Sequence, residues 1–292
     1  MDKISEISVI IPTMSGREAM VNKLLSTLPE ECEKIIVPDE DILLAAKRNK
    51  GARLSKGKYL FFVDDDNYLK NEFQLRKMLD DFKEEIGVMG MTACYDDKKM
   101  LVADGGSLRN YLTGFTRGLR TNCPAYGDCL NPYFPTDETA RLTKQQTYAV
   151  DEVANAFMIR RDVFEESGRF DEVNFPIDLD EADLCKRIKD MGYIVVMNPG
   201  AVCYHRSQTY SSLPNFRRAS NAYFLPRNKL FYQRKHLNAL SYWVHVFVFL
   251  PLHICVYTTA LIWRKKFSLI LPYLKGTWDG LCGRRENKYQ AR

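Results

Sequence analysis

The chain has 292 residues, 46% hydrophobic and 12% aromatic, so it can bury one large domain with an appendage, or two small domains. Residues 206–292 carry 15 Lys and Arg against two acids, whereas the chain as a whole carries 42 Lys and Arg against 37 Asp and Glu. The front part is therefore acidic, which argues against nucleic acid as a partner. The sequence has no repeat with a period of about 20 to 50 residues, which excludes repeat architectures.

Apolar runs and helical patterns alternate along the front part of the chain. The runs predicted as strands are 7–13, 34–38, 59–63 and 87–94, and the segments predicted as helices include 41–54 and 71–84. Continuous apolar strands with intervening helices predict an α/β fold, with a mostly parallel sheet covered on both faces. Ligands of such sheets bind beyond the carboxyl ends of the strands. Thr13, Asp39 and the 64–66 cluster stand at such ends.

Three adjacent acids, Asp64, Asp65 and Asp66, follow directly on the apolar run 59–63. Side chains alternate along an extended segment, so Asp64 and Asp66 should point one way and Asp65 the other. One carboxylate could hold a sugar hydroxyl while the next binds a divalent cation, which would offset the repulsion between them. The alternative is a solvated turn whose acids cap the following helix.

A second acidic group opens the helical pattern of "DEADLCKRIKDMGY". Asp178, Asp180, Glu181 and Asp183 crowd the predicted start of this helix, and Gly192 ends it. One acid suffices to cap a helix, so mutual repulsion among four should raise the pKa of at least one of them. A carboxylate with a raised pKa suits a general base. From this segment alone, capping and base catalysis remain equally open.

The strand pattern "YIVVMNPGAVCYH" ends in His205. A lone histidine is usually an ordinary surface residue, but this one stands at a strand end in a chain that also offers an acid cluster. It is therefore a candidate metal ligand. A site with carboxylate oxygens and one imidazole suits Mn²⁺ somewhat better than Mg²⁺.

The C-terminal part contains 22 residues, Tyr242 to Trp263, without an Asp, Glu, Lys or Arg. As a helix this run would be roughly 33 Å long, close to the hydrocarbon thickness of a bilayer. Basic residues flank it on both sides, and Pro251 stands inside it, so we expect membrane contact without deciding whether the run spans the bilayer or lies in one leaflet. The eight cysteines form no CxxC motif, which predicts reduced, mostly buried thiols in a protein that faces the cytosol.

Several motifs, taken together and in order, resemble the inverting nucleotide-sugar glycosyltransferases of family 2. They are "SVIIPTMSGR", "AAKRNKGARLSKGKYLFFVDDDN", "VDEVANAFMIRRDVFEESGRFDE", "DEADLCKRIKDMGY", "NPGAVCYH" and "PRNKLFYQRKH". The resemblance covers most of the chain and is closest to the membrane-associated, rhamnosyltransferase-like branch. It implies the GT-A fold, a nucleotide-sugar donor, and an Mn²⁺ or Mg²⁺ cofactor. It also implies a glycan or lipid-linked acceptor in cell-surface polysaccharide or glycan assembly.

The resemblance also assigns roles to residues. It implies that Thr13 and Asp39 contact the nucleoside, that Arg48 lies near the nucleotide, and that Asp64 and Asp65 belong to the donor site. The metal ligands would be Asp66 and His205. The family's base is the second acid of a Glu-Asp pair, and here the pair is Asp180-Glu181; Glu181 is the predicted base, with Asp180 left open. Arg206 and Arg227 are predicted contacts of a donor or acceptor phosphate.

These inferences divide the chain into two predicted regions. Residues 1–210 would form the GT-A domain, with the nucleotide sugar bound by about 1–100 and the acceptor by about 101–210. Residues 211–292, with the apolar segment 242–263, would form a basic helical region that binds membrane lipid and leaves the catalytic domain facing the cytoplasm. The alternative functions are a sugar nucleotidyltransferase, an aspartate-dependent phosphatase and a non-catalytic membrane protein that binds nucleotide sugars.

Overall fold

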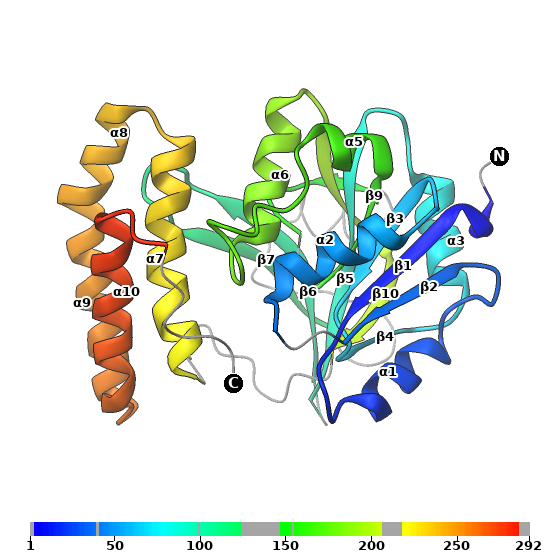
Figure 1. The fold of residues 1–292 in the computed structure, drawn as a ribbon, viewed down its shortest axis with the longest axis horizontal. Helices are drawn as coiled ribbons and strands as arrows, with labels where there is room; N and C mark the ends of the chain where they lie inside the picture. The colour runs from blue at the N-terminus through cyan, green and yellow to red at the C-terminus, as the bar shows by residue number, and fades with distance from the viewer. Residues whose placement is uncertain are drawn as a thin grey trace.

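The protein is seen here as a computed structural model that describes residues 3–38, 41–97, 100–123, 147–153, 155–205 and 218–285. Figure 1 shows an α/β part built on one sheet and, beside it, a group of C-terminal helices. The predicted mixed α/β fold with an apolar C-terminal helix is confirmed.

The described residues contribute ten strands to one sheet. The strands are β1 (Ile7–Pro12), β2 (Glu33–Val37), β3 (Tyr59–Val63), β4 (Asn67–Leu69), β5 (Ile86–Asp97), β6 (Met100–Arg109), β7 (Thr116–Cys123), β8 (Tyr148–Ala149), β9 (Ala156–Arg160) and β10 (Ile194–His205). Their order is β2-β1-β3-β9-β5-β10-β4, with β6 paired to β5 and β7, and β8 paired to β10. β1 is parallel to both β2 and β3, so the carboxyl ends of these three strands meet at one edge.

The sheet differs from the predicted arrangement at β9, which sequence reasoning did not identify as a strand. β9 runs antiparallel between β3 and β5, and the side chains of residues 156–159 are buried. Two antiparallel steps restore the original direction, so β5 runs parallel to β3, and β10 pairs with β5 in parallel. The central strands that were predicted as parallel therefore keep a common direction although the sheet is mixed.

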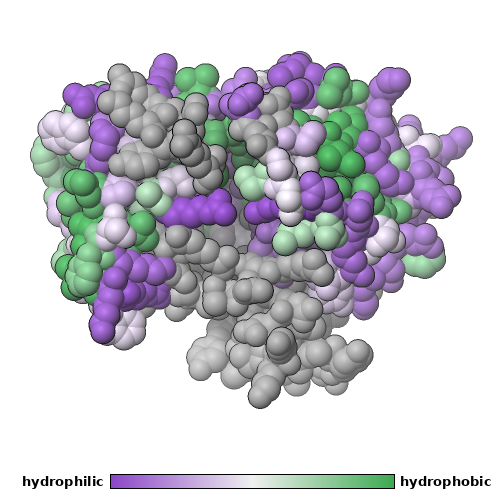
Figure 2. Space-filling model, turned by 60° about the horizontal axis from the view of Figure 1, so that its bottom comes forward, coloured by the Kyte–Doolittle hydropathy of each residue, from purple (hydrophilic) through white to green (hydrophobic). Residues whose placement is uncertain are grey.

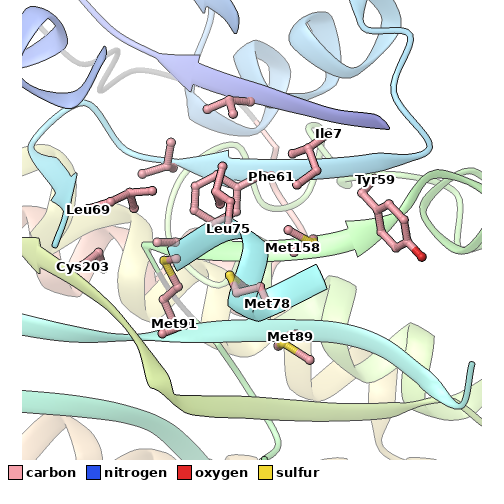
Figure 3. Close-up of a cluster of buried hydrophobic side chains, with 14 of the residues drawn as sticks. Ile7, Tyr59, Phe61, Leu69, Leu75, Met78, Met89, Met91, Met158 and Cys203 are labelled. Atoms are coloured by element: carbon pink, nitrogen blue, oxygen red, sulfur yellow. The ribbon is translucent and has the colours of Figure 1, made fainter. Parts of the chain in front are cut away.

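Helices cover both faces of the sheet. They are α1 (Glu18–Leu25), α2 (Leu44–Leu54), α3 (Phe73–Asp81), α5 (Arg161–Glu166) and α6 (Asp180–Asp190). Phe61 of β3 faces a core that includes residues of α1 and α3, and its neighbour Phe62 faces a second core with α2, α5 and α6. Figure 3 shows Phe61 beside Leu75 and Met78 of α3. Burial on both faces explains why the strands read as continuous apolar runs.

The predicted helix 71–84 is shorter in the structure. The Oδ1 atom of Asn71 accepts the backbone N–H of Phe73 at 3.2 Å, so α3 begins at Phe73 and Asn71 stays outside it. A short polar side chain that accepts a backbone N–H in this way favours a helix start over a helix interior.

The C-terminal helices are α7 (Ala219–His236), α8 (Ala239–Val244), the π-helical turn η2 (His245–Phe249), α9 (Leu250–Trp263), the short η3 (Phe267–Leu269) and α10 (Ile270–Leu281). α10 packs closely on α7, because a Cβ atom added at Gly276 would stand 2.0 Å from the carbonyl oxygen of Tyr223. Residues Ala239–Trp263 form one continuous helical stretch that is long and apolar enough to cross a membrane, and 22% of its most apolar window is buried.

Among the cysteines, Cys32, Cys185 and Cys203 are buried free thiols, whereas Cys255 and Cys282 are exposed free thiols on the C-terminal helices. Burial raises the pKa of the Cys32 and Cys185 thiols. These two side chains therefore behave as small apolar groups that fill the two cores of the α/β part.

Candidate functional site

A cavity of about 540 Å³ opens at the sheet edge where β1 and β3 end. The described residues that line it are Pro12, Thr13, Met14, Ser15, Arg17, Ile42, Leu43, Leu44, Lys47, Asp64, Asp65, Asp66, Ile177 and Arg218. The volume falls within the range of small-molecule and cofactor sites, about 300 to 1,000 Å³. The turn after β1, the start of α2 and the acids after β3 thus form a single pocket, as expected for the carboxyl edge of parallel strands.

The middle acid, Asp65, is buried and takes part in a compact network. Thr13 Oγ1 donates to Asp65 Oδ2 at 2.6 Å, and Arg17 Nη1 lies 2.5 Å from Asp65 Oδ1. Lys47 Nζ in turn donates to the carbonyl oxygen of Thr13 at 2.5 Å. One cation, Arg17, and the hydroxyl of Thr13 therefore stabilise this carboxylate, and Lys47 helps to hold the turn after β1 in place through the Thr13 carbonyl.

Asp66 faces His205, the last residue of β10. The two residues lie close because β10 pairs with β4 in a register that sets His205 opposite Asn67. His205 Nε2 is 3.4 Å from Asp66 Oδ1. Burial is the main cause that raises the pKa of Asp66, and the neighbouring acids Asp64 and Asp65 add to it.

These two side chains form an incomplete metal site on their own. Among the described residues there is no group of three or more His, Cys, Asp or Glu that could hold a metal ion. Divalent cations in phosphate-handling sites are commonly held by one or two protein ligands, with substrate phosphates completing the shell. A carboxylate and an imidazole beside an open cavity fit that pattern, so Asp66 and His205 are suited to a cation that a diphosphate helps to bind.

Arg48 of α2 connects the strand-end acids to the second acidic group. Its side chain is fully buried, and Nη2 lies 2.9 Å from Asp64 and 2.8 Å from Glu181. Nη1 donates to Asp180 Oδ2 at 2.6 Å. Three carboxylates around one guanidinium raise the pKa of Arg48 against the opposing effect of burial. The predicted Asp64, Asp180 and Glu181 therefore meet at one cation, although they come from distant parts of the chain.

The two acids at the start of α6 differ in exposure. The side chain of Asp180 is 1% exposed and that of Glu181 is 18% exposed. Burial, against the opposing effect of Arg48 and with smaller contributions from Asp180 and Asp64, raises the pKa of Glu181 to about 8. Burial also raises the pKa of Asp180. Of the pair, Glu181 combines access to solvent with a pKa close to neutrality, which are the two properties that a general base needs.

The turn before α6 has an unusual backbone. Asp178 and Leu179 adopt φ angles of 62° and 64°, a left-handed region that costs non-glycine residues of order 1–3 kcal/mol each. Asn228 of α7 holds this turn, since its Nδ2 donates to the carbonyl oxygens of Ile177 at 2.6 Å and Asp178 at 2.9 Å. A strained turn fixed from outside presents Asp180 and Glu181 in one defined orientation.

Not all predicted residues reach this site. Asp39 and Arg206 lie outside the described residues. Arg227, a predicted phosphate contact, is fully buried; its Nη2 donates to the carbonyl oxygen of Asn174 at 3.1 Å, and it is not among the described residues that line the cavity. Arg48 likewise is not among the described residues that line the cavity, and it contacts Asp64 of the wall; its predicted place near the nucleotide stays a prediction.

Sequence reasoning missed two cations of the cavity wall. Arg17 follows the turn after β1, and Lys47 precedes Arg48 in α2. The available signal was position, since both lie within a few residues of the strand-end edge. Arg218, which directly precedes α7, also lines the cavity.

The family model and the two solved structures described next are all of glycosyltransferases. The sequence model of the family described as "Glycosyltransferase like family" matches residues 17–224. Among curated protein sequences, none matches this chain. The fold is similar to that of GalNAc-T7, solved with UDP, GalNAc and Mn²⁺ (TM-score 0.51, 13% identity, 75% of this chain), and this chain spans 47% of that protein's length. It is also similar to mannosyltransferase PcManGT from Pyrobaculum calidifontis, solved with GDP-Man and Mn²⁺ (TM-score 0.51, 11% identity, 96% of this chain and 88% of that one).

Proposed function

The chain belongs to the glycosyltransferase-like family, and on that premise we propose that it moves a sugar from a nucleotide-sugar donor to a hydroxyl group of a glycan or lipid-linked acceptor. The observation that carries the proposal is Arg48, which joins Asp64 in the cavity wall to the pair Asp180 and Glu181. Sugar transfer requires a donor pocket and a proton acceptor in immediate proximity, and this network supplies both.

We propose that the cavity binds the donor. Its strand-end carboxylates suit hydroxyl groups of a ribose or sugar, and Arg17, Lys47 and Arg218 in its wall suit a diphosphate. Two proteins of similar fold were solved with UDP or GDP-Man, which supports a nucleoside diphosphate sugar. The transferred group is proposed to be a hexose or deoxyhexose, in keeping with the rhamnosyltransferase-like branch that the motifs resemble.

Asp66 and His205 are the residues proposed to hold a divalent cation, Mn²⁺ or Mg²⁺. When bound there, the cation offsets negative charge on the departing nucleoside diphosphate. Both proteins of similar fold were solved with Mn²⁺, which supports this choice. Arg17 and Lys47 add fixed positive charge to the same wall, so the cavity can attract a diphosphate before any reaction begins.

Glu181 is proposed to act as the base. Its carboxylate takes the proton of the acceptor hydroxyl while the acceptor oxygen bonds to the anomeric carbon and the bond from that carbon to the diphosphate oxygen breaks. A single displacement of this kind inverts the anomeric centre. Asp180 is engaged by Arg48 and is proposed to hold that guanidinium in place, which keeps Glu181 close to the donor pocket.

We also propose where the reaction takes place. The exposed apolar and basic helices after residue 218 favour attachment to a membrane. The catalytic domain would then face the cytoplasm, where nucleotide sugars are supplied, and the product would enter cell-surface polysaccharide or glycan assembly.

The test uses the full-length protein with Mn²⁺ and a panel of nucleotide sugars, with release of the nucleoside diphosphate as the readout. The Asp66→Ala variant should lose metal-dependent release while its thermal unfolding stays close to that of the wild type. Asp162→Ala is the matched control, because Asp162 is an exposed acid of the same domain and its loss should leave release unchanged. Full activity of Asp66→Ala would remove the assignment.

The rival functions are distinguished by their substrates and products. A sugar nucleotidyltransferase would form a nucleotide sugar from a nucleoside triphosphate and a sugar phosphate, and a phosphatase would release phosphate from small monoesters. A non-catalytic protein would bind the nucleotide sugar without hydrolysis or transfer. Observation of any of these patterns, with no sugar transfer, would replace the proposal.

A further inference from the structure

The apolar stretch Tyr242–Trp263 has two unlike sides. On the inner side, His245 and His253 are buried, and their ring centroids lie 5.7 Å apart. His245 Nδ1 is 3.0 Å from the carbonyl oxygen of Leu112, and the ring of His253 lies 4.3 Å from that of Phe115. Leu112 and Phe115 belong to the connection between β6 and β7, so the middle of the apolar stretch rests on the catalytic domain itself.

This contact is incompatible with a helix that crosses a bilayer. The middle of such a helix lies in hydrocarbon, where lipid-exposed loop backbone does not occur and charged side chains are costly and rare. Here the middle of the helix contacts a loop and also Lys229 of α7, whose Nζ is 3.4 Å from His253 Nε2. A spanning arrangement would carry the loop and Lys229 into the membrane core.

α7 fixes the orientation further, because it is fastened to the catalytic domain along its length. Asn228 near its middle bonds the turn before α6. Near its end, Lys235 lies 2.9 Å from Asp171 and His236 lies 2.8 Å from Asp183. The helices that follow α7 therefore stand beside the domain, as Figure 1 shows, and they do not extend away from it.

The opposite side of the helices is an exposed apolar surface, which we call the outer face. It comprises Trp243, Phe247 and Leu252 on the α8–α9 stretch and Leu271, Leu274 and Trp278 on α10. On α10 the spacing of three and four residues marks one stripe, and on the α8–α9 stretch Trp243 and Phe247 stand four residues apart. Phe247 and Leu271 are each 73% exposed. In Figure 2 hydrophobic surface gathers at the left edge, where Figure 1 has these helices.

The net positive charge of residues 218–285 indicates which kind of partner the outer face binds. Residues 218–285 carry eleven Lys and Arg and a single acid, Asp279. Asp279 is buried and lies near Lys275 and Arg284. Arg234 stands before the α8–α9 stretch and the basic residues 264–266 follow it, which suits a helix whose two ends meet lipid headgroups of the same leaflet. Two copies of the chain joined by this face would bring two strongly cationic regions together.

From these observations we propose that the outer face docks flat on one leaflet of an anionic lipid bilayer, with α9 in the plane of the membrane and both of its ends on the cytoplasmic side. The inference rests on the membrane association proposed above and adds its geometry. It sets the apolar stripes in the acyl boundary and keeps the β6–β7 connection and the donor cavity in water.

The first experiment measures topology on sealed vesicles, without any donor or acceptor. Exposed positions at the two ends of the stretch, Ala239→Cys and Ser268→Cys, are introduced singly into a full-length protein whose Cys94, Cys123, Cys129, Cys255 and Cys282 are replaced by serine, so that only the buried thiols of Cys32, Cys185 and Cys203 remain besides the new one. A membrane-impermeant thiol reagent added outside should label both variants equally. Protection of either end behind the bilayer would show a spanning helix and overturn the proposal.

The second experiment measures co-flotation of the protein with vesicles of zwitterionic lipid, with or without anionic lipid. Binding should be strong with anionic lipid and should fall about tenfold or more in the double variant Phe247→Ser, Leu271→Ser. The control Leu54→Ser, Phe73→Ser removes two exposed apolar residues of the catalytic domain and should bind like the wild type. Equal binding of both double variants, absence of wild-type binding, or a wild-type dimer that the outer-face variant converts to monomer would each overturn the proposal. Since neither readout uses sugar transfer, failure here leaves the proposed reaction to its own assay.

Discussion

Two basic side chains, the fully buried Arg48 in the α/β part and the half-buried Lys229 in the helical part, show how differently the two regions treat charge. Arg48 is surrounded by three carboxylates, which raise its pKa. Lys229 lies near the ring of Phe115 and near His253, and burial, together with Arg109, lowers its pKa to about 7. One cation is held by opposite charge, and the other is accommodated by losing charge.

The contrast distinguishes the region proposed to carry the reaction from the region proposed to attach to a membrane. Around Arg48, each charge depends on the others, so a small change in one carboxylate alters its neighbours. Around Lys229, aromatic rings and imidazoles form a weakly polar contact between the helices and the β6–β7 connection. The predictions below exploit this difference.

The largest effect is expected on the free energy of unfolding, when Arg48 and Lys229 are each replaced by methionine in separate variants. Arg48→Met would leave Asp64, Asp180 and Glu181 without their shared partner, and should lower the free energy of unfolding by about 3–5 kcal/mol. Lys229→Met removes a desolvated amine and should change that free energy by less than about 1 kcal/mol. Urea unfolding followed by circular dichroism compares the two, and equal losses would contradict the distinction drawn here.

The second effect concerns the proposed base. Glu181→Gln keeps the size of the side chain but removes its basicity, so kcat should fall about 10²- to 10⁴-fold. Glu181→Asp should retain part of the activity, since a carboxylate remains. Steady-state release of the nucleoside diphosphate in the presence of acceptor is the measurement; a fully active Glu181→Gln enzyme would exclude this residue as the base.

The third prediction is a pH dependence. The pKa of Glu181 is raised to about 8, so the carboxylate form required of a base increases with pH, and the transfer rate should rise up to about tenfold per unit below that value. The free energy of unfolding should depend on pH in the opposite direction. The folded state holds a proton on Glu181 more tightly than the unfolded state, so the stability present below the ordinary pKa of 4.5 is lost as pH rises through about 8.

Both trends can be checked on the same proteins. The rate and the free energy of unfolding of the wild type are measured across pH 5 to 9, and Glu181→Gln should flatten the contribution of this group to the stability profile. A wild-type rate that falls between pH 6 and 8 would contradict the assignment.

The smallest effect is expected from the contact between the two regions. Asn228→Ala removes both hydrogen bonds to the turn at Ile177 and Asp178, so kcat should fall about tenfold through misplacement of Glu181 while KM for the donor stays unchanged. Asn198→Ala is the control, because Asn198 is also fully buried but bonds Asp81 away from this turn. A change in KM alone, or equal losses in both variants, would assign Asn228 a purely structural role.

Much of the site could be approached from sequence because its acids follow short-range patterns. The run of strand residues before Asp64 and the strand ending in His205 both have clear apolar signals, and β3 and β10 indeed end there. β9 was missed because a five-residue buried strand inside a longer mixed segment has no alternation to identify it. The three carboxylates around Arg48 could not be predicted, because they come from segments distant in the chain.

Sequence by itself determined several local elements of this protein: the strands with clear apolar runs, where acids accumulate, and that residues 242–263 avoid charge. These follow from hydrophobic periodicity and from helix-end chemistry, which act over a few residues. Tertiary structure decided the long-range pairings. It brought Asp64 and Glu181 to the guanidinium of Arg48. It also set the middle of the apolar stretch against residues 112 and 115. Both outcomes depend on packing between segments distant in the chain, and no local pattern encodes them.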